Sequence, residues 1–264
     1  MNMTHPPEGT YTPPPPQPAS PSGTVSVALP SSRPAVTYTI LGVTVCVYLL
    51  QILSRFIFGE DLLIALGAKA NELIRAGQLW RFFTPMLLHS SSGLPLHIGF
   101  NMYALYIFGT GLERRYGHER FLLLYVLSGF AGTVFSFLFS SVYSIGASGA
   151  IFGLIGAEGI FLVQNRKLFG AQVGKAINNV IFVVAINLFL GLSPGIDNWG
   201  HVGGLMGGLI FAWFAGPHWR VEGIYPNLHV VDQREPRGVI VAVAVVTLIF
   251  CTLAAIGMWF PFVK

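Results

Sequence analysis

Long apolar stretches separated by short polar ones make up most of this chain after its first 34 residues. An apolar stretch of about 20 residues crosses the hydrocarbon of a bilayer as one helix. Some of the stretches are shorter and rich in glycine, which suits helices that pack closely against other helices. The pattern predicts seven transmembrane helices, at Val36–Phe58, His97–Leu112, Phe121–Phe139, Ser148–Val163, Ala176–Leu192, Trp199–Ala215 and Val239–Met258.

These helices predict an all-α fold, a polytopic membrane helix bundle with a six-span core at 35–215 and one additional C-terminal span at 239–264. Residues 216–238 are expected to be a cytoplasmic linker. Residues 1–34 include the proline run Pro13 to Pro16 and lack the basic start and short apolar core of a signal peptide. Because proline removes N–H donors and favours polyproline II, this segment is expected to be a disordered cytoplasmic tail.

Composition supports a membrane protein. The chain is 53% hydrophobic and 10% charged, whereas soluble domains average about 25% charged residues. A net charge of +4 is too small and too scattered for a nucleic-acid-binding surface, so the lipid bilayer is the expected partner. Both cysteines, Cys46 and Cys251, lie inside apolar runs, and no Cys/His spacing resembles a zinc site. We therefore expect no disulfide framework, no metal and no cofactor.

Lysine and arginine indicate the orientation, because they are enriched in cytoplasmic loops. With the N-terminus in the cytoplasm, the outer side carries only five of the 15 basic residues, namely Arg55, Lys69, Arg75, Arg81 and Lys264. Every even-numbered span then starts at the outer face. His97 opens the second span, Ser148 the fourth and His201 lies near the start of the sixth. Three polar residues from distant stretches are thus predicted at one depth, and this holds even if the whole protein is inverted.

Ser148 lies in the run Gly146-Ala147-Ser148-Gly149. On its own this run has a simple explanation, because small residues in membrane helices let backbones approach one another. It is also not the G-x-S-x-G turn of soluble hydrolases, since Ala150 occupies the position of the last glycine.

His201 changes the interpretation of Ser148. A histidine inside a membrane span is a candidate functional residue, although it can also be structural and bind a backbone carbonyl. A nucleophilic serine needs a base, and histidine is the usual one. Glycines at four-residue spacing would let the two helices meet, because each set forms a single stripe on its helix. These glycines are Gly149 and Gly153 in the fourth span and Gly200, Gly204 and Gly208 in the sixth.

His97 and Asn101 are four residues apart and therefore share one face of the second span. Both can donate hydrogen bonds without carrying charge. Cleavage of an amide requires such donors where the carbonyl oxygen becomes negative. The alternative is a polar pair that holds helices together.

The combination of these motifs resembles the rhomboid family of intramembrane serine proteases, in the order in which the family carries them. Each motif is weak by itself, but the set is specific and covers residues 80 to 210. The matching residues are His97 and Asn101, Gly146 to Gly149, Gly200 and His201, the first-loop set Trp80, Arg81, Thr84 and His89, and the Gly109, Glu113 and Gly117 pattern.

The resemblance implies roles for the polar residues. Ser148 would be the nucleophile and His201 its base, as a dyad without a carboxylate. His97, Asn101 and the Ser148 N–H would form the oxyanion hole. Phe152 stands where many family members carry an aromatic residue, often tyrosine, against the histidine, so that ring stacking would orient His201.

The resemblance assigns structural roles to Trp80, Arg81 and Glu113, with Glu113 binding loop backbone groups or a neighbouring arginine. Glu158 lies ten residues beyond Ser148, so it is expected about 15 Å deeper, near the midplane, as a protonated or hydrogen-bonded packing residue. Asp197 lies one turn before the histidine, and we expect it to be a solvated loop residue.

The predicted function is an intramembrane serine endopeptidase whose substrates are single-span membrane proteins, in the plasma membrane of a bacterium with the N-terminus cytoplasmic. One alternative is a catalytically inactive rhomboid-like protein that binds membrane proteins or acts as their chaperone. Loss of the serine or the histidine usually marks that class, and both are present here. A transporter would need internal repeats and more buried charge, and a structural scaffold would not need three polar sites at one depth.

Overall fold

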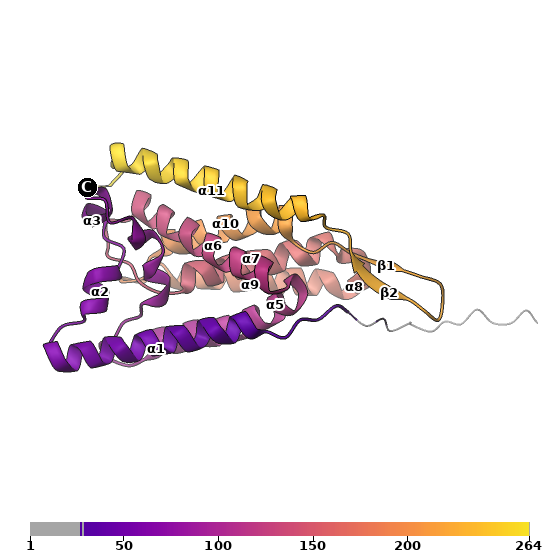
Figure 1. Ribbon diagram of the computed structural model, residues 1–264, viewed down its shortest axis with the longest axis horizontal. Helices are drawn as coiled ribbons and strands as arrows, with labels where there is room; N and C mark the ends of the chain where they lie inside the picture. The colour runs from indigo at the N-terminus through magenta and orange to yellow at the C-terminus, as the bar shows by residue number, and fades with distance from the viewer. Residues whose placement is uncertain (1–26, 28, 264) are drawn as a thin grey trace, which may run out of the picture.

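The computed structural model describes residue 27 and residues 29–263, and it is an elongated bundle of helices (Figure 1). Most of the predicted tail at 1–34 lies outside the described residues. Helix α1 (Ala35–Phe58) begins at one end of the bundle and runs to the opposite end (Figure 1). The prediction of a helical membrane bundle was confirmed, whereas the division into six spans plus one stays a prediction.

Helices lie at each of the seven predicted positions, with ends that differ by a few residues. Four of them are long and apolar enough to cross a membrane: Ala35–Phe58, His118–Phe139, Arg166–Leu190 and Pro236–Trp259. The second predicted span is helical without a break, but a π-helical stretch in its middle divides it into three segments. The helices are α1 (Ala35–Phe58), α4 (Leu96–Ala104), η3 (Leu105–Gly109), α5 (Thr110–Tyr116), α6 (His118–Phe139), α7 (Ser148–Gln164), α9 (Val173–Leu190), α10 (Asn198–Ala215) and α11 (Pro236–Trp259).

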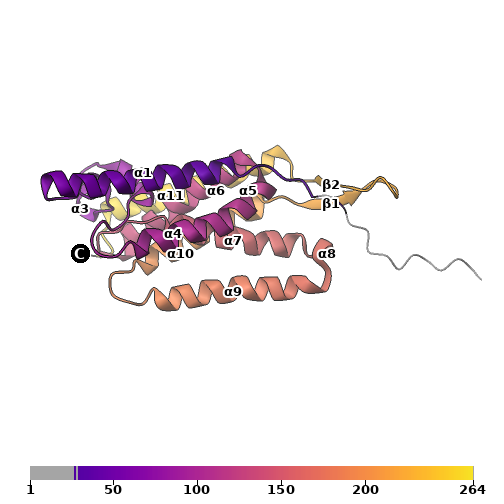
Figure 2. The same ribbon diagram turned by 90° about the horizontal axis from the view of Figure 1, so that it is seen from below.

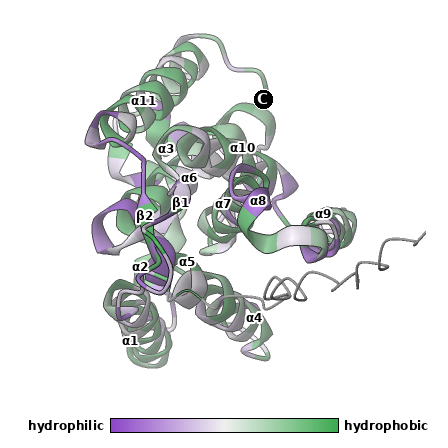
Figure 3. Cartoon of the chain, turned by 90° about the vertical axis from the view of Figure 1, so that its right-hand side faces the viewer, coloured by the Kyte–Doolittle hydropathy of each residue, from purple (hydrophilic) through white to green (hydrophobic). Residues whose placement is uncertain are grey.

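The core lies where α6, α7 and α10 pack together, with α11 against the outer side of α6 and α10 (Figures 1 and 3). Glycines explain why α10 can lie so close to two helices at once. A Cβ at Gly203 would be 2.5 Å from the Cβ of Phe135 in α6, and a Cβ at Gly132 would be 2.6 Å from the carbonyl oxygen of Gly200. Larger residues would force the helices apart.

The loop between α1 and α4 folds over one end of the bundle, the end where α1 and α11 terminate (Figure 1). It contains four short helical elements, which are α2 (Leu62–Gly67), α3 (Asn71–Arg75), η1 (Leu79–Phe82) and η2 (Thr84–Leu87). Phe82 inserts from this loop between Phe130 and Phe137 of α6, with ring centroids 5.9 and 5.5 Å away. The loop is therefore anchored in the core rather than lying free on the surface.

Helix α9 stands apart from the rest of the bundle (Figures 2 and 3). It packs on α7, and none of its residues is buried. Two short elements, α8 (Arg166–Phe169) and η4 (Gly170–Gln172), connect it to α7.

The segment 216–238 contains a β-hairpin that the sequence pattern did not predict. Strands β1 (Trp219–Glu222) and β2 (His229–Asp232) pair antiparallel, with Trp219 opposite Asp232, and project beyond the end of the bundle (Figure 1). Trp219 is buried and packs edge-on against Phe161 of α7, with ring centroids 4.9 Å apart. The expected linker is thus an ordered connection, because its first strand is fixed to the core.

Candidate active site

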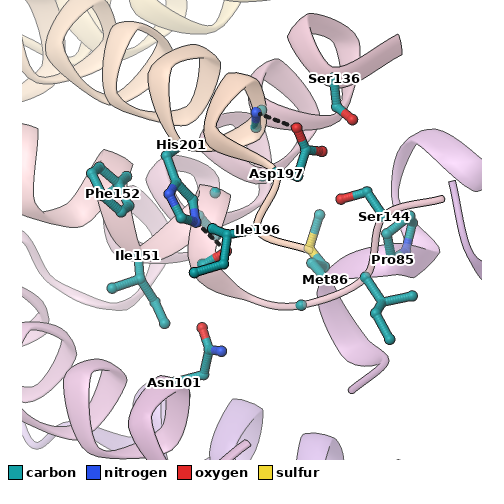
Figure 4. Close-up of a pocket in the computed structure, with 18 of the residues that line it drawn as sticks. Pro85, Met86, Asn101, Ser136, Ser144, Ile151, Phe152, Ile196, Asp197 and His201 are labelled. Carbon is teal, nitrogen blue, oxygen red and sulfur yellow. Dashed lines mark hydrogen bonds between the residues drawn. The ribbon is translucent and has the colours of Figure 1, made fainter. Parts of the chain in front are cut away.

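Ser148 and His201 meet at the start of two adjacent helices. Ser148 is the first residue of α7, and His201 lies in the first turn of α10. The Ser148 Oγ and the His201 Nε2 are 2.9 Å apart, within hydrogen-bonding distance (Figure 4). Gly146, two residues before the start of α7, has a φ of +123°, so the chain turns sharply just before the serine and presents its hydroxyl at the helix end.

The ring of Phe152 orients the imidazole of His201. Phe152 lies one turn after Ser148 in α7, and the two rings stack with centroids 4.3 Å apart and planes 10° apart (Figure 4). The His201 Nδ1 is buried and, within the described part of the chain, has no hydrogen-bond partner. The orientation of the ring therefore depends on the stacked phenyl group and on the bond to Ser148.

Glycines bring α7 and α10 close enough for this bond. A Cβ at Gly204 would overlap the carbonyl of Gly149, and a Cβ at Gly208 would overlap the carbonyl of Gly153. A Cβ at Gly149 would lie 3.2 Å from the carbonyl oxygen of Gly200. Gly149, Gly153, Gly204 and Gly208 thus lie where a side chain would push α7 and α10 apart. Gly200 contributes its carbonyl oxygen to this contact, and a Cβ there would meet only the carboxylate of Asp197.

Asp197 is not the solvated loop residue that we expected. It is the N-cap of α10, partly buried, and its Oδ1 accepts a hydrogen bond from the Gly200 N–H at 3.2 Å. Its Oδ2 is buried and finds no hydrogen-bond donor among the residues described. The expectation was wrong because a helix start provides free N–H groups that an aspartate satisfies. No hydrogen bond joins its carboxylate to the imidazole in the described structure.

His97 and Asn101 line the same cavity as the serine, and both come from α4. The Nε2 of His97 lies against Gly146, only 2.8 Å from where a Cβ of that glycine would be. The Asn101 Nδ2 donates to the carbonyl of His97, one turn earlier, at 2.9 Å. The Ser148 N–H belongs to the first turn of α7, where backbone N–H groups have no partner within the helix. All three residues line the cavity.

The cavity has a volume of about 540 Å³ and is bounded by elements that are far apart in sequence. Its walls include the segment 142–146, which precedes the serine, as well as the start of α10. Toward the side of the bundle it is flanked by Phe100 and Ala104 of α4 and by Val183 and Asn187 of α9. An extended polypeptide could therefore reach the serine from the side of the bundle between α4 and α9.

The first-loop residues identified in the sequence hold that loop together. Arg81 is buried and donates to the carbonyls of Ala65 and Ala68, at 2.7 and 2.6 Å. The Trp80 indole donates to the carbonyl of Leu66 at 3.0 Å, while half of the side chain stays exposed. The guanidinium of Arg81 thus supplies donors to carbonyls at the end of α2, which have no partner within that short helix.

His89 links the first loop to the residue before the serine. Its Nε2 lies 3.5 Å from the Ala147 N–H, and its ring centroid lies 5.1 Å from that of His97. Burial, followed by the neighbouring His97, lowers the pKa of His89 to about 4, so its imidazole is neutral and can accept this bond at neutral pH. Gln51 of α1 bonds both the N–H and the carbonyl of His89, a role that no sequence signal suggested.

Glu113 binds the beginning of α1 rather than an arginine. Its carboxylate accepts from the N–H groups of Val36 and Thr37, at 2.8 and 2.7 Å, and from the Thr37 hydroxyl and the His118 imidazole, both at 2.6 Å. These N–H groups are free at a helix start, and a carboxylate there is also favoured by the helix dipole.

Glu158 forms an ion pair with Arg115 of α5, a partner that no sequence pattern indicated. Arg115 donates through both terminal nitrogens, at 2.9 Å from Nη1 to Oε1, and its guanidinium lies 4.5 Å from the centroid of Phe161. Glu158 is therefore paired toward the end of the bundle opposite the serine. Residues 43 positions apart in sequence carry no pattern that predicts such a pair.

No group of three or more His, Cys, Asp or Glu side chains in the described ranges is arranged to hold a metal ion. The lining of the cavity includes two histidines, four serines, two asparagines and a single carboxylate, that of Asp197. Such a set can transfer protons and stabilise an oxyanion, which is the chemistry of acyl transfer.

The comparisons with known proteins all indicate one family. Residues 76–218 match the Rhomboid domain. The rhomboid protease GluP of Bacillus subtilis is 40% identical over 190 residues, which are 72% of this chain and 36% of GluP. The rhomboid protease AarA of Providencia stuartii is 33% identical over 211 residues, 70% of this chain and 74% of AarA. The mitochondrial RHOMBOID-like protein 6 of Arabidopsis thaliana is 38% identical over 139 residues, 52% of this chain and 44% of that protein. The chain thus spans about a third of GluP and less than half of the Arabidopsis protein.

Proposed function

This chain belongs to the rhomboid family, and on that premise we propose that it is a serine endopeptidase that cleaves membrane proteins within or at the edge of the bilayer. The observation that carries the proposal is the hydrogen bond of 2.9 Å between Ser148 and His201 at the cavity wall. A catalytically inactive binding protein is less well supported, because it would not require a serine and a histidine in contact.

In the proposed reaction, the Ser148 Oγ attacks the carbonyl carbon of the scissile amide while His201 Nε2 takes the hydroxyl proton. The carbonyl oxygen becomes negative in the tetrahedral intermediate, next to the Ser148 N–H, His97 and Asn101. His201 then gives its proton to the leaving amine as the C–N bond breaks. Water, with His201 again as base, hydrolyses the acyl-enzyme ester and restores the serine. No cofactor is required at any step.

The proposed substrates are single-span membrane proteins whose helices unwind easily and that carry a small residue at the cut. Support comes from the position of the cavity between α4 and α9. The flanking residue Phe100 is 71% exposed, so the approach to the cavity is apolar as well as open. An extended segment leaving the bilayer would reach the serine along this route.

Cleavage by the purified protein tests this proposal. A single-span fusion protein in detergent should be cut at one site, and the new N-terminus can be identified by mass spectrometry. Treatment with an isocoumarin, which acylates active serines, should stop the cut. Cleavage that persists after complete isocoumarin labelling, or no cleavage of any of a panel of spans with small residues, would contradict the assignment.

Asn101 is expected to act on the transition state rather than on binding. Replacing it by alanine should lower turnover by about ten- to a thousand-fold with little change in KM, because a donor to the oxyanion is lost while two remain. Asn101→Asp should be slower still, since a carboxylate repels the oxyanion. Turnover and thermal stability are measured on the same preparations. An alanine variant that melts early but keeps full turnover per folded molecule would place Asn101 among the packing residues.

The protein is a multi-pass membrane protein, and we propose that it lies in a bacterial plasma membrane with its N-terminus in the cytoplasm. A cysteine at Ser193, exposed between α9 and α10, should then react with an impermeant thiol reagent on intact cells. A cysteine at Lys167, exposed between α7 and α9, should not. Both are made in a background without Cys46 and Cys251, which are free and exposed. The reverse labelling pattern would invert the proposed orientation.

A further inference from the structure

Lys69 is a fully buried lysine that the proposed reaction does not use. It lies in the first loop between α2 and α3, and its exposed fraction is 0%. Its ammonium donates to the carbonyl oxygens of Ser140 and Val142, at 2.7 and 2.9 Å. A buried lysine is costly unless it is hydrogen-bonded. Its position against two backbone carbonyls therefore indicates a specific role in holding that backbone.

The backbone that Lys69 holds is the segment 140–147, which leads from α6 into Ser148. The Lys69 N–H and carbonyl also pair with Ser144, at 3.0 and 3.2 Å, so the lysine contacts the segment through main chain and side chain together. Asn71 adds a third donor, with its Nδ2 3.0 Å from the carbonyl of Ser140. We define this set of bonds as the Lys69 tether.

The segment has few other means of holding its position. Val142 is 58% exposed and Tyr143 is 67% exposed, so burial of apolar side chains does not fix the first half of the segment, and only Ala147 at its end is buried in the core. Further along, the Gly146 N–H donates to the carbonyl of Pro85 at 2.9 Å. The segment also forms one wall of the cavity and ends at the serine. Its position thus determines both the shape of the cavity and the placement of the nucleophile.

Resting on the proposed function, we infer that Lys69 is a positioning residue, whose ammonium holds the segment 140–147 so that Ser148 stays in register with His201 and the oxyanion donors. The charges around Lys69 come from both sides of the site. Asp197, the cap of the helix that carries His201, favours its charged form, as does Glu72, while Arg75 opposes it. Lys69 is therefore hydrogen-bonded to the segment that precedes Ser148 and interacts electrostatically with the cap of the helix that carries His201.

The protonation of Lys69 provides a readout that a purely packing role would not have. Burial, the largest cause, lowers its pKa to about 8. The ammonium is thus present below about pH 8 and is lost above it, whereas an unfolded chain keeps the proton to a higher pH. The neutral amine still has two N–H donors, but it loses the charge that makes such bonds about twice as strong. Turnover should therefore fall as the pH rises through about 8.

The test compares Lys69→Met, which keeps the length and apolar stem, with Lys175→Met, which removes an exposed lysine of α9. At pH 7, turnover of Lys69→Met should fall about a hundredfold, as expected for a small displacement of a reacting group, and Lys175→Met should match wild type. Between pH 7 and 9, wild type should lose about threefold or more of its turnover, while Lys69→Met should stay flat. A Lys69→Met enzyme with wild-type turnover, or with the same alkaline fall, would overturn the inference.

Amide hydrogen exchange tests the tether without using activity. In Lys69→Met the amides of residues 142–146 should exchange about tenfold faster at fixed pH, because the carbonyls of Ser140 and Val142 lose their bonds to the ammonium. If that variant does not fold, Asn71→Leu removes one donor to the same carbonyl and should give a smaller increase in the same amides. Unchanged exchange in whichever of these variants folds refutes the tether. If wild type shows no serine-dependent cleavage, the proposed function fails, and the exchange result still decides the tether.

Discussion

Replacing Ser148 by alanine is expected to reduce turnover of a membrane substrate by about ten thousand-fold or more, because no other group can form the acyl-enzyme. The fold should remain, since a methyl group fits where the hydroxyl was. The loss of one hydrogen bond to His201 should cost only about 1 kcal/mol of stability. Turnover is measured by appearance of the cleaved fragment, and folding by thermal melting of the same sample.

Labelling by a fluorophosphonate provides an independent measurement of the same residue. Wild type should react at Ser148, and the alanine variant should not react at all. Ser144→Ala is the matched control, because that serine lines the same cavity and its hydroxyl has no hydrogen bond among the described residues. The control should retain turnover within about threefold of wild type, because the bonds of Ser144 to Lys69 are made by the backbone and only an unbonded hydroxyl is removed. Labelled Ser148→Ala protein, or a Ser144→Ala variant as inactive as Ser148→Ala, would assign the nucleophile elsewhere.

The positions of the helices could be predicted because each span needs a long apolar run, and such runs are visible in the sequence. The common depth of Ser148 and His201 could be inferred in the same way, since helices that cross one bilayer begin and end at the same two faces. Their contact was suggested by glycines on both helices. At Gly149 and Gly204 the absence of a side chain is needed for the close approach of α7 and α10.

The interactions that the sequence did not indicate join segments without any periodic pattern. Lys69 was only one of five basic residues assigned to the outer side, although its ammonium holds the segment before the serine. Glu158 was expected to be a protonated or hydrogen-bonded packing residue, and its partner was not identified because Arg115 belongs to another helix. The β-hairpin was missed because its strands are four residues each, too short for a clear alternation of apolar and polar positions.

The second large effect is expected at His201. Replacing it by alanine should reduce turnover about as much as Ser148→Ala, because the serine hydroxyl then has no base to take its proton. The double variant should be no slower than either single variant, since members of one catalytic unit do not contribute additively. All three are compared by single-turnover cleavage with excess enzyme. If the two effects multiply, Ser148 and His201 do not act as a unit.

The same single-turnover assay, applied to Asp197→Asn, distinguishes a catalytic dyad from a triad. In a Ser-His-Asp triad, changing the aspartate to asparagine lowers turnover by about ten thousand-fold, because the imidazole adopts the wrong tautomer. Here Asp197 bonds the Gly200 N–H, and Phe152 stacks on the imidazole instead. Asp197→Asn keeps an oxygen that can cap α10, so turnover should fall by less than about tenfold, in line with the small cost of exchanging one good N-cap residue for another. A fall as large as that of His201→Ala would make Asp197 the third member, and the unpartnered Nδ1 of His201 would then acquire its partner in the working enzyme.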